Sequence, residues 1–134
     1  MTYLRIAAPF IVGSVMALTG ISSGIANAAT VVKYNAASFN NALKKGKTVV
    51  VHVHADWCIT CVRQEKPLKA ELSKPAFSKV RAYQVNYDRD KAFLNKYRIN
   101  SQSTILVFKK GRVVAKSVGQ TSRGVISAVL RKAL

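Results

Sequence analysis

Apolar and polar positions follow two different spacings along the chain after residue 29. Runs rich in β-branched residues predict strands, and the strongest run, TVVVHV at 48–53, is mostly apolar on both faces, which is typical of a central strand. Between these runs, apolar residues that share one face at helical spacing predict helices. The predicted strands are 31–34, 49–53, 80–85, 103–108 and 113–118, and the predicted helices are 38–46, 58–72, 90–97 and 122–134.

Capping and turn residues support this division. Ser38 is expected to cap the first helix, and Gly46 to end it. A turn at 109–111 joins the last two strands as a hairpin, and Ser122 is expected to start the closing helix. The resulting order, β-α-β-α-β-α-β-β-α, predicts an α/β fold with a central mixed sheet and helices on both faces.

The first 28 residues have the order of charge, apolar core and small residues that is typical of a secretory signal peptide. Arg5 precedes an apolar run from Ile6 to Ile25, and Ala26-Asn27-Ala28 supplies an A-x-A cleavage site. We therefore predict a signal peptide at 1–28, a single domain at 29–134 and a periplasmic location. The alternative is an uncleaved membrane anchor, because the apolar run is nearly as long as the roughly 20 residues that span a bilayer.

The chain is strongly basic, with 22 Lys and Arg residues against 5 Asp and Glu residues and a formal net charge of +17. The basic residues are scattered rather than gathered in one block. They predict faster encounters with acidic partners and anionic membrane faces without identifying either. Because the chain is predicted to be exported and shows no nucleic-acid-binding motif, we expect no nucleic-acid partner.

Both cysteines of the chain, Cys58 and Cys61, stand in the segment HADWCITC, directly after the predicted central strand. A bridge between them would close a very short loop and restrict the unfolded chain little, so a purely structural role explains the pair poorly. At the start of a helix, unpaired amides and the helix dipole favour the Cys58 thiolate, and Cys61 lies one turn further along, within reach of a mixed disulfide. We therefore predict a redox-active pair in which Cys58 attacks and Cys61 resolves, in a compartment where disulfides persist.

The same segment allows a metal site as an alternative. His52 and His54 lie on one face of the strand by its period of two, and with the two cysteines they offer two nitrogens and two sulfurs to zinc or copper. Their spacing is tighter than that of the usual zinc knuckles, and Val62 stands where covalent haem attachment needs histidine. We predict no resident metal and no cofactor, with a Cys/His metal-binding module as the competing function.

From about Val31 to Leu134 the chain resembles thioredoxin. The resemblance is carried by four collinear segments, ADWCITC, VNYDRDKAFLNKYRI, STILVFKKG and SVGQTSRGVISAVL. Within the superfamily, ADWCITC followed by Glu65-Lys66 most resembles the periplasmic thioredoxin-like domain of DsbD-type transmembrane thiol:disulfide interchange proteins. The resemblance implies a thioredoxin fold and an oxidoreductase that reduces disulfide-containing exported proteins and takes electrons from a membrane donor. We also expect a monomer.

Two positions depart from the family pattern. His52 stands where thioredoxin keeps a buried aspartate that accepts a proton from the second cysteine, so either a catalytic base or a packed core histidine is expected there. Ser103 stands where the family has a cis-proline, and the bond before it is expected to be trans, because a cis bond before serine costs about 3 kcal/mol. The resemblance implies that Trp57, Ser103 and Thr104 contact the substrate.

The two residues between the cysteines bear on the direction of electron flow. Ile59 and Thr60 carry no charge and no imidazole that would hold the thiolate strongly ionised. A dithiol whose reduced form is less stabilised is less oxidising, which favours a reductase. The chain shows no nicotinamide or flavin motif, so its reduced form must be regenerated by another protein. A disulfide oxidase or isomerase stays open as an alternative, because His52 and Ser103 alter the site.

Overall fold

The computed structural model describes residues 28–134. The predicted signal peptide, apart from its last residue, lies outside this part of the chain. Within residues 28–134, no helix combines the length and the apolar character needed to cross a membrane.

The described chain follows the predicted order of strands and helices. Its strands are β1 (Val31–Lys33), β2 (Val49–His54), β3 (Arg81–Asn86), β4 (Thr104–Lys109) and β5 (Arg112–Val118). Its α-helices are α1 (Ala36–Lys44), α2 (Ile59–Leu72), α3 (Lys91–Lys96) and α4 (Arg123–Leu130), and two short 3-10 turns occupy Pro75–Phe77 and Arg131–Ala133.

The strands form one mixed sheet in the order β1-β3-β2-β4-β5. β1 and β2 run parallel to β3, whereas β4 is antiparallel to both β2 and β5. β2 lies in the middle, and all of its residues are buried. The prediction that the valine-rich run forms a central strand is therefore confirmed, as is the α/β class with a mixed sheet.

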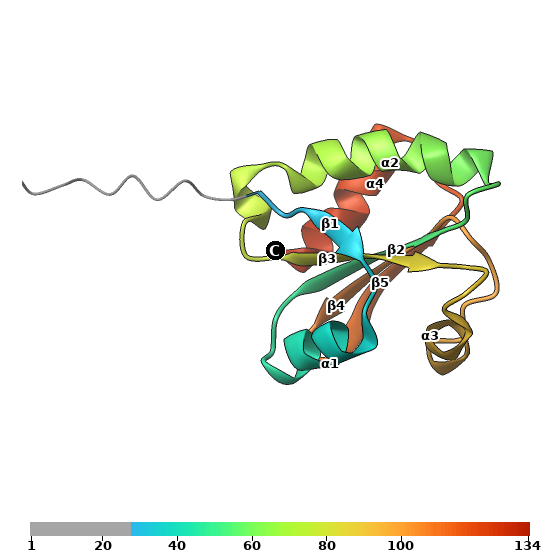
Figure 1. Ribbon diagram of the computed structural model, residues 1–134. Helices are drawn as coiled ribbons and strands as arrows, with labels where there is room; N and C mark the ends of the chain where they lie inside the picture. Colours follow the sequence, from blue (N-terminus) through green and yellow to red (C-terminus); the bar gives the residue numbers. More distant parts are fainter. Residues whose placement is uncertain (1–27) are drawn as a thin grey trace, which may run out of the picture.

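Helices cover both faces of this sheet, α1 and α3 on one side and α2 and α4 on the other (Figure 1). Each face has its own apolar core, the first built around Phe39 and Phe93 and the second around Leu68 and Ile126. Side chains along β2 alternate between the two cores. Val53 belongs to the first, so the residues on either side of it, His52 and His54, face α2.

The first helix begins before the residue predicted to cap it. The cap of α1 is Asn35, whose Oδ1 accepts a hydrogen bond of 2.9 Å from the Ser38 amide. The Ser38 hydroxyl instead pairs with the Tyr83 hydroxyl at 2.9 Å. The prediction of Ser38 as the cap was wrong because the asparagine three residues earlier is placed to bond its amide, which is the usual reach of a cap side chain.

Candidate active site

The cysteine pair lies at the junction between β2 and α2. Cys58 is the N-cap of α2, and its Sγ accepts a hydrogen bond of 3.1 Å from the Cys61 amide. A thiol in this position lies at the positive end of the helix dipole. Both cysteines are free thiols; Cys58 is 4% exposed and Cys61 is 0% exposed. The sequence therefore placed the pair correctly, with the first thiol at the helix start and the second turned inward.

Ser103 lies between the two sulfurs. Its Oγ is 3.1 Å from Cys58 Sγ and 3.1 Å from Cys61 Sγ. A hydroxyl has one proton, so Oγ donates to one sulfur while it accepts from the other. When Cys58 is the thiolate, Ser103 donates to Cys58 and accepts the proton of the Cys61 thiol.

The backbone of Ser103 is held in an uncommon conformation. Its φ is 59°, in the left-handed region that costs a residue with a Cβ, while the peptide bond before it is trans, as predicted. The Ser103 amide donates to the Val53 carbonyl at 2.9 Å, and the Ser103 carbonyl accepts from the Gly119 amide at 2.9 Å. These bonds hold the hydroxyl against the sulfurs where the family pattern has proline.

The surroundings of the two thiols shift their pKa values in opposite directions. Burial disfavours the charged form of Cys58, but hydrogen bonds from Cys61, Ser103 and the amides at the start of α2 outweigh it and lower the pKa of Cys58. Burial raises the pKa of Cys61, and its contact with Cys58 raises it further. Cys58 is thus the thiol that ionises first.

His52 belongs to a buried hydrogen-bond network. Its Nε2 lies 3.1 Å from Oε1 of Gln64, whose Nε2 donates to the carbonyls of Ser103, at 2.9 Å, and Gln120, at 2.8 Å. Burial lowers the pKa of His52 to about 4, so the ring is neutral at pH 7 and a weak base. Its hydrogen bond goes to Gln64 rather than to Cys61, and its predicted role as a proton acceptor stays a prediction.

Gln64 was not singled out from the sequence, although it joins the histidine to the loop that carries Ser103. It is fully buried on α2, three residues after Cys61 and so on the same face of the helix. A polar residue at that spacing from a buried cysteine is the signal by which it could have been found.

An apolar rim surrounds the buried sulfurs and consists of Trp57, Ile59 and Val62, which are 63%, 68% and 55% exposed. Trp57 Nε1 donates to Oδ2 of Asp88 at 2.9 Å, which fixes the indole at the edge of the site. Exposed large apolar side chains beside a reactive group mark a contact surface. Of the other predicted substrate contacts, Ser103 reaches the sulfurs, whereas Thr104 is fully buried and its hydroxyl donates to the Ser101 carbonyl at 2.7 Å.

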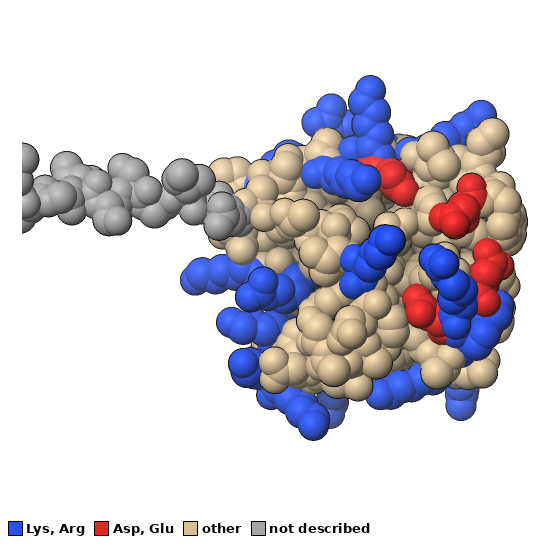
Figure 2. All heavy atoms as spheres, in the orientation of Figure 1, with Lys and Arg blue, Asp and Glu red and all other residues tan. Residues whose placement is uncertain are grey.

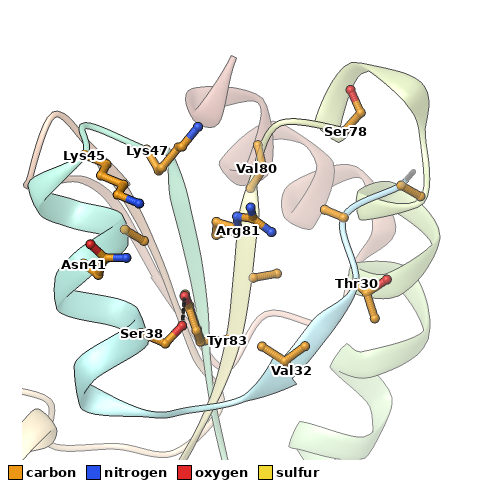
Figure 3. A pocket seen from close by; sticks show the side chains of 14 residues that line it. Thr30, Val32, Ser38, Asn41, Lys45, Lys47, Ser78, Val80, Arg81 and Tyr83 are labelled. Carbon is orange, nitrogen blue, oxygen red and sulfur yellow. Dashed lines mark hydrogen bonds between the residues drawn. The ribbon is translucent and has the colours of Figure 1, made fainter. Parts of the chain in front are cut away.

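A hollow lies at the other end of the sheet. It has a volume of about 680 Å³ between α1, β1 and β3, and its lining includes Lys45, Lys47 and Arg81 but no acidic residue, histidine or cysteine (Figure 3). Arg81 pairs with Val49, the first residue of β2, whereas the cysteines come after the last residue of that strand. The hollow therefore lies apart from the thiol chemistry.

Acidic residues gather at the thiol end instead. Asp88 binds Trp57, and Asp56 and Glu65 lie beside His54. On the face shown in Figure 2, the visible acidic side chains lie toward the right, and the charged side chains visible toward the left, where the described chain begins, are those of lysine and arginine. The net charge of the protein is thus unevenly spread.

A dithiol at a strand-to-helix junction, with an acidified outer thiol and a buried inner one, is the site of a thiol:disulfide oxidoreductase. The sequence model described as Thioredoxin matches residues 30–132 of this chain. The chain belongs to the thioredoxin family. The redox-active cysteine pair and the oxidoreductase activity that this site defines are those of the family.

Individual relatives agree with this assignment. The thioredoxin of Rickettsia bellii (strain RML369-C) is 36% identical over 77 residues, which cover 58% of this chain and 72% of that protein. The thioredoxin of Pseudomonas aeruginosa is 30% identical over 101 residues, covering 75% of this chain and 93% of that protein. Among solved structures, Trxlp from Edwardsiella tarda EIB202 is 38% identical, with a TM-score of 0.71 over 74% of this chain and 96% of that one.

Removal of the Ser103 hydroxyl is expected to weaken the Cys58 thiolate. In Ser103→Ala the thiolate loses a hydrogen bond, so the pKa of Cys58 rises. Alkylation of Cys58 at pH 7 is expected to slow by about tenfold, because a hydrogen bond to a charged group is worth about 1.5 kcal/mol, or roughly one pKa unit. The rate is measured with iodoacetamide across a pH series. Within residues 28–134 the Ser101 hydroxyl donates to the Gln102 carbonyl and bonds neither sulfur, so Ser101→Ala is the matched control. An unchanged rate in Ser103→Ala would show that the hydroxyl does not stabilise the thiolate.

Proposed function

We propose that this protein is an exported reductase of protein disulfides. The observation that carries the proposal is the inequality of its two thiols: Cys58 ionises first, at the helix start beside an apolar rim, while Cys61 is fully buried with a raised pKa. A low-pKa outer thiol is suited to attack and a buried inner thiol to resolution. The signal-like sequence at 1–28 supports export to the periplasm.

The proposed reaction runs in two exchanges. The Cys58 thiolate attacks one sulfur of a substrate disulfide, forming a mixed disulfide and releasing the other substrate sulfur as a thiolate. Cys61 then gives up its proton and attacks Cys58 Sγ, which releases the second substrate thiol. The substrate gains two electrons, and the protein is left with a disulfide between Cys58 and Cys61. The Ser103 hydroxyl, bonded to both sulfurs, is placed to take part in the proton transfer from Cys61.

Each turnover leaves the protein oxidised, so it needs a dithiol donor. We propose that the donor is a membrane protein of the thiol:disulfide interchange type, as the resemblance of ADWCITC and Glu65-Lys66 to the DsbD-type domain implies. The apolar rim of Trp57, Ile59 and Val62 offers one contact surface to both donor and substrate. A single such surface suits a monomer that meets its two partners in turn.

The reduction potential decides the direction of electron flow. The neutral Ile59-Thr60 pair supports a reduction potential near that of thioredoxin, at about −270 mV. The potential is measured by equilibrating the protein with a glutathione series and counting its thiols by alkylation and mass analysis. Thr60→His is the matched variant, because an imidazole beside the thiolate stabilises the reduced form and shifts the couple toward oxidants. A wild-type value near about −120 mV would make the protein an oxidant and overturn the proposal.

A further inference from the structure

Three side chains that could ligate a metal converge behind the cysteine pair. Within residues 28–134, one ligand atom each from His52, His54 and Cys61 lie within 4.8 Å of one another, and all three residues are buried. The two histidines come from β2 and the cysteine from the first turn of α2. The redox reaction uses Cys61 but gives no task to His54.

His54 carries a polar atom without a partner. Its Nδ1 is buried and makes no hydrogen bond to any described residue, although Oε1 of Glu65 lies 3.1 Å away, out of line for one. A buried polar atom without a partner costs about 1–3 kcal/mol, and a bound ion is one of the partners that can satisfy such an atom. Carboxylates such as Glu65 commonly stand beside metal-binding imidazoles and orient them.

The tautomer of His52 leaves it a lone pair for a metal. Because the Gln64 amide nitrogen donates to two carbonyls, its oxygen must face the ring. An oxygen accepts only, so Nε2 of His52 carries the proton and Nδ1 is left with the lone pair that a metal ion needs.

We propose that the reduced protein binds one thiophilic closed-shell cation, Zn²⁺ or Cu⁺, through His52, His54 and Cys61. Two imidazole nitrogens and one thiolate form a donor set that both ions accept. Binding releases the proton of Cys61, and the Ser103 hydroxyl can bond the ligated sulfur. A hollow of about 330 Å³ reaches one of the three ligands, His54. Its charged lining is mixed, with Asp56 and Asp90 against Lys33 and Arg89.

This site couples metal binding to the redox state. A metal-bound Cys61 cannot resolve a mixed disulfide, and a disulfide between Cys58 and Cys61 removes the sulfur ligand. This regulatory consequence rests on the proposed function, whereas the binding itself does not. The metal-loaded protein is expected to reduce disulfides more slowly and to recover when a chelator removes the ion.

The test is a metal competition with the full chain, in which Cys58 is the one histidine or cysteine outside the proposed ligand set. The protein is reduced, desalted without oxygen, and titrated with Zn²⁺ and with Cu⁺ against a chromophoric chelator of each. We expect one ion per chain, at least tenfold weaker binding in His52→Asn and in His54→Gln, and no binding to the oxidised protein. Ser117→Ala, which changes a buried polar residue on β5 outside the cluster, is the matched control. Circular dichroism checks that each variant is folded.

Several outcomes overturn the site. They are equal affinity in wild type and both histidine variants, equal binding to the oxidised protein, or no retention of either ion at micromolar concentration. Disulfide reduction by the same samples in excess chelator separates this inference from the proposed function. Full disulfide reduction without metal binding would overturn only the proposed metal site. Metal binding without disulfide reduction would overturn only the proposed reductase function.

Discussion

Replacement of Cys58 by serine is expected to abolish disulfide reduction. Without the attacking thiolate no mixed disulfide forms, and the buried Cys61, with its raised pKa, is poorly placed to substitute. The rate of insulin reduction, measured with a thiol donor, should fall by at least about a hundredfold in Cys58→Ser, because a neutral serine hydroxyl is a far weaker nucleophile than a thiolate.

Cys61→Ser is the informative partner of this variant. Its Cys58 still attacks, but no second thiol resolves the product, so the variant should accumulate mixed disulfides that survive non-reducing gels and disappear with reductant. The double variant should show neither reduction nor trapping. Full insulin reduction by Cys58→Ser, or the absence of trapped mixed disulfides in Cys61→Ser, would contradict the assignment of the two roles.

The stability of the reduced, metal-free protein is expected to depend on pH through His52. Its pKa in the folded state is lowered to about 4, first by burial, so the unfolded chain takes up the proton at a higher pH than the folded one. The contribution of His52 to the free energy of unfolding is therefore fully present above the ordinary pKa of about 6.5. It is lost as the pH falls from about 6.5 to about 4. The size of the shift corresponds to a loss on the order of 3 kcal/mol in the free energy of unfolding.

Denaturant unfolding between pH 8 and pH 4, with a chelator present, measures this loss. Four groups facing His52 act on it: Gln64 and Glu65 favour the charged ring, whereas His54 and Lys69 oppose it. His52→Gln should lose most of the pH dependence, and His54→Gln, made on the same strand, should keep it. Glu71, whose pKa is lowered first by Lys74, adds a separate loss only at lower pH, in all variants alike. An equal slope in wild type and His52→Gln would refute the role of His52.

Local chemistry was enough to predict most of the fold. The run of valines places apolar side chains on both faces of a strand, so both faces had to be buried, and the run forms the middle strand of the sheet. The C-x-x-C pair that follows this strand stands at the start of α2, where the helix amides and the helix dipole favour a thiolate. The cap of α1 was harder, since Asn35 and Ser38 are both good cap residues and only the path of the chain selects between them.

The inner parts of the site depended on residues far apart in sequence. Ser103 meets the cysteines across more than forty residues, and its left-handed φ is set by bonds to Val53 and Gly119. The partner of His52 was harder to find, because the spacing of Gln64 from Cys61 places it on the buried face of α2 but does not show that it meets His52. Sequence reasoning could name these positions as departures from the family pattern, but only tertiary contacts define what each side chain touches.

The uneven placement of charge gives this domain a pronounced electric dipole. Four of its five acidic residues, Asp56, Glu65, Asp88 and Asp90, lie around the thiol end, while Lys45, Lys47 and Arg81 line a hollow at the opposite end. In the field of a negatively charged protein or membrane, the domain turns its cationic end forward and its sulfurs outward. Long-range attraction would thus anchor the protein with its thiols free, and the final approach of a disulfide would depend on short-range contact with Trp57.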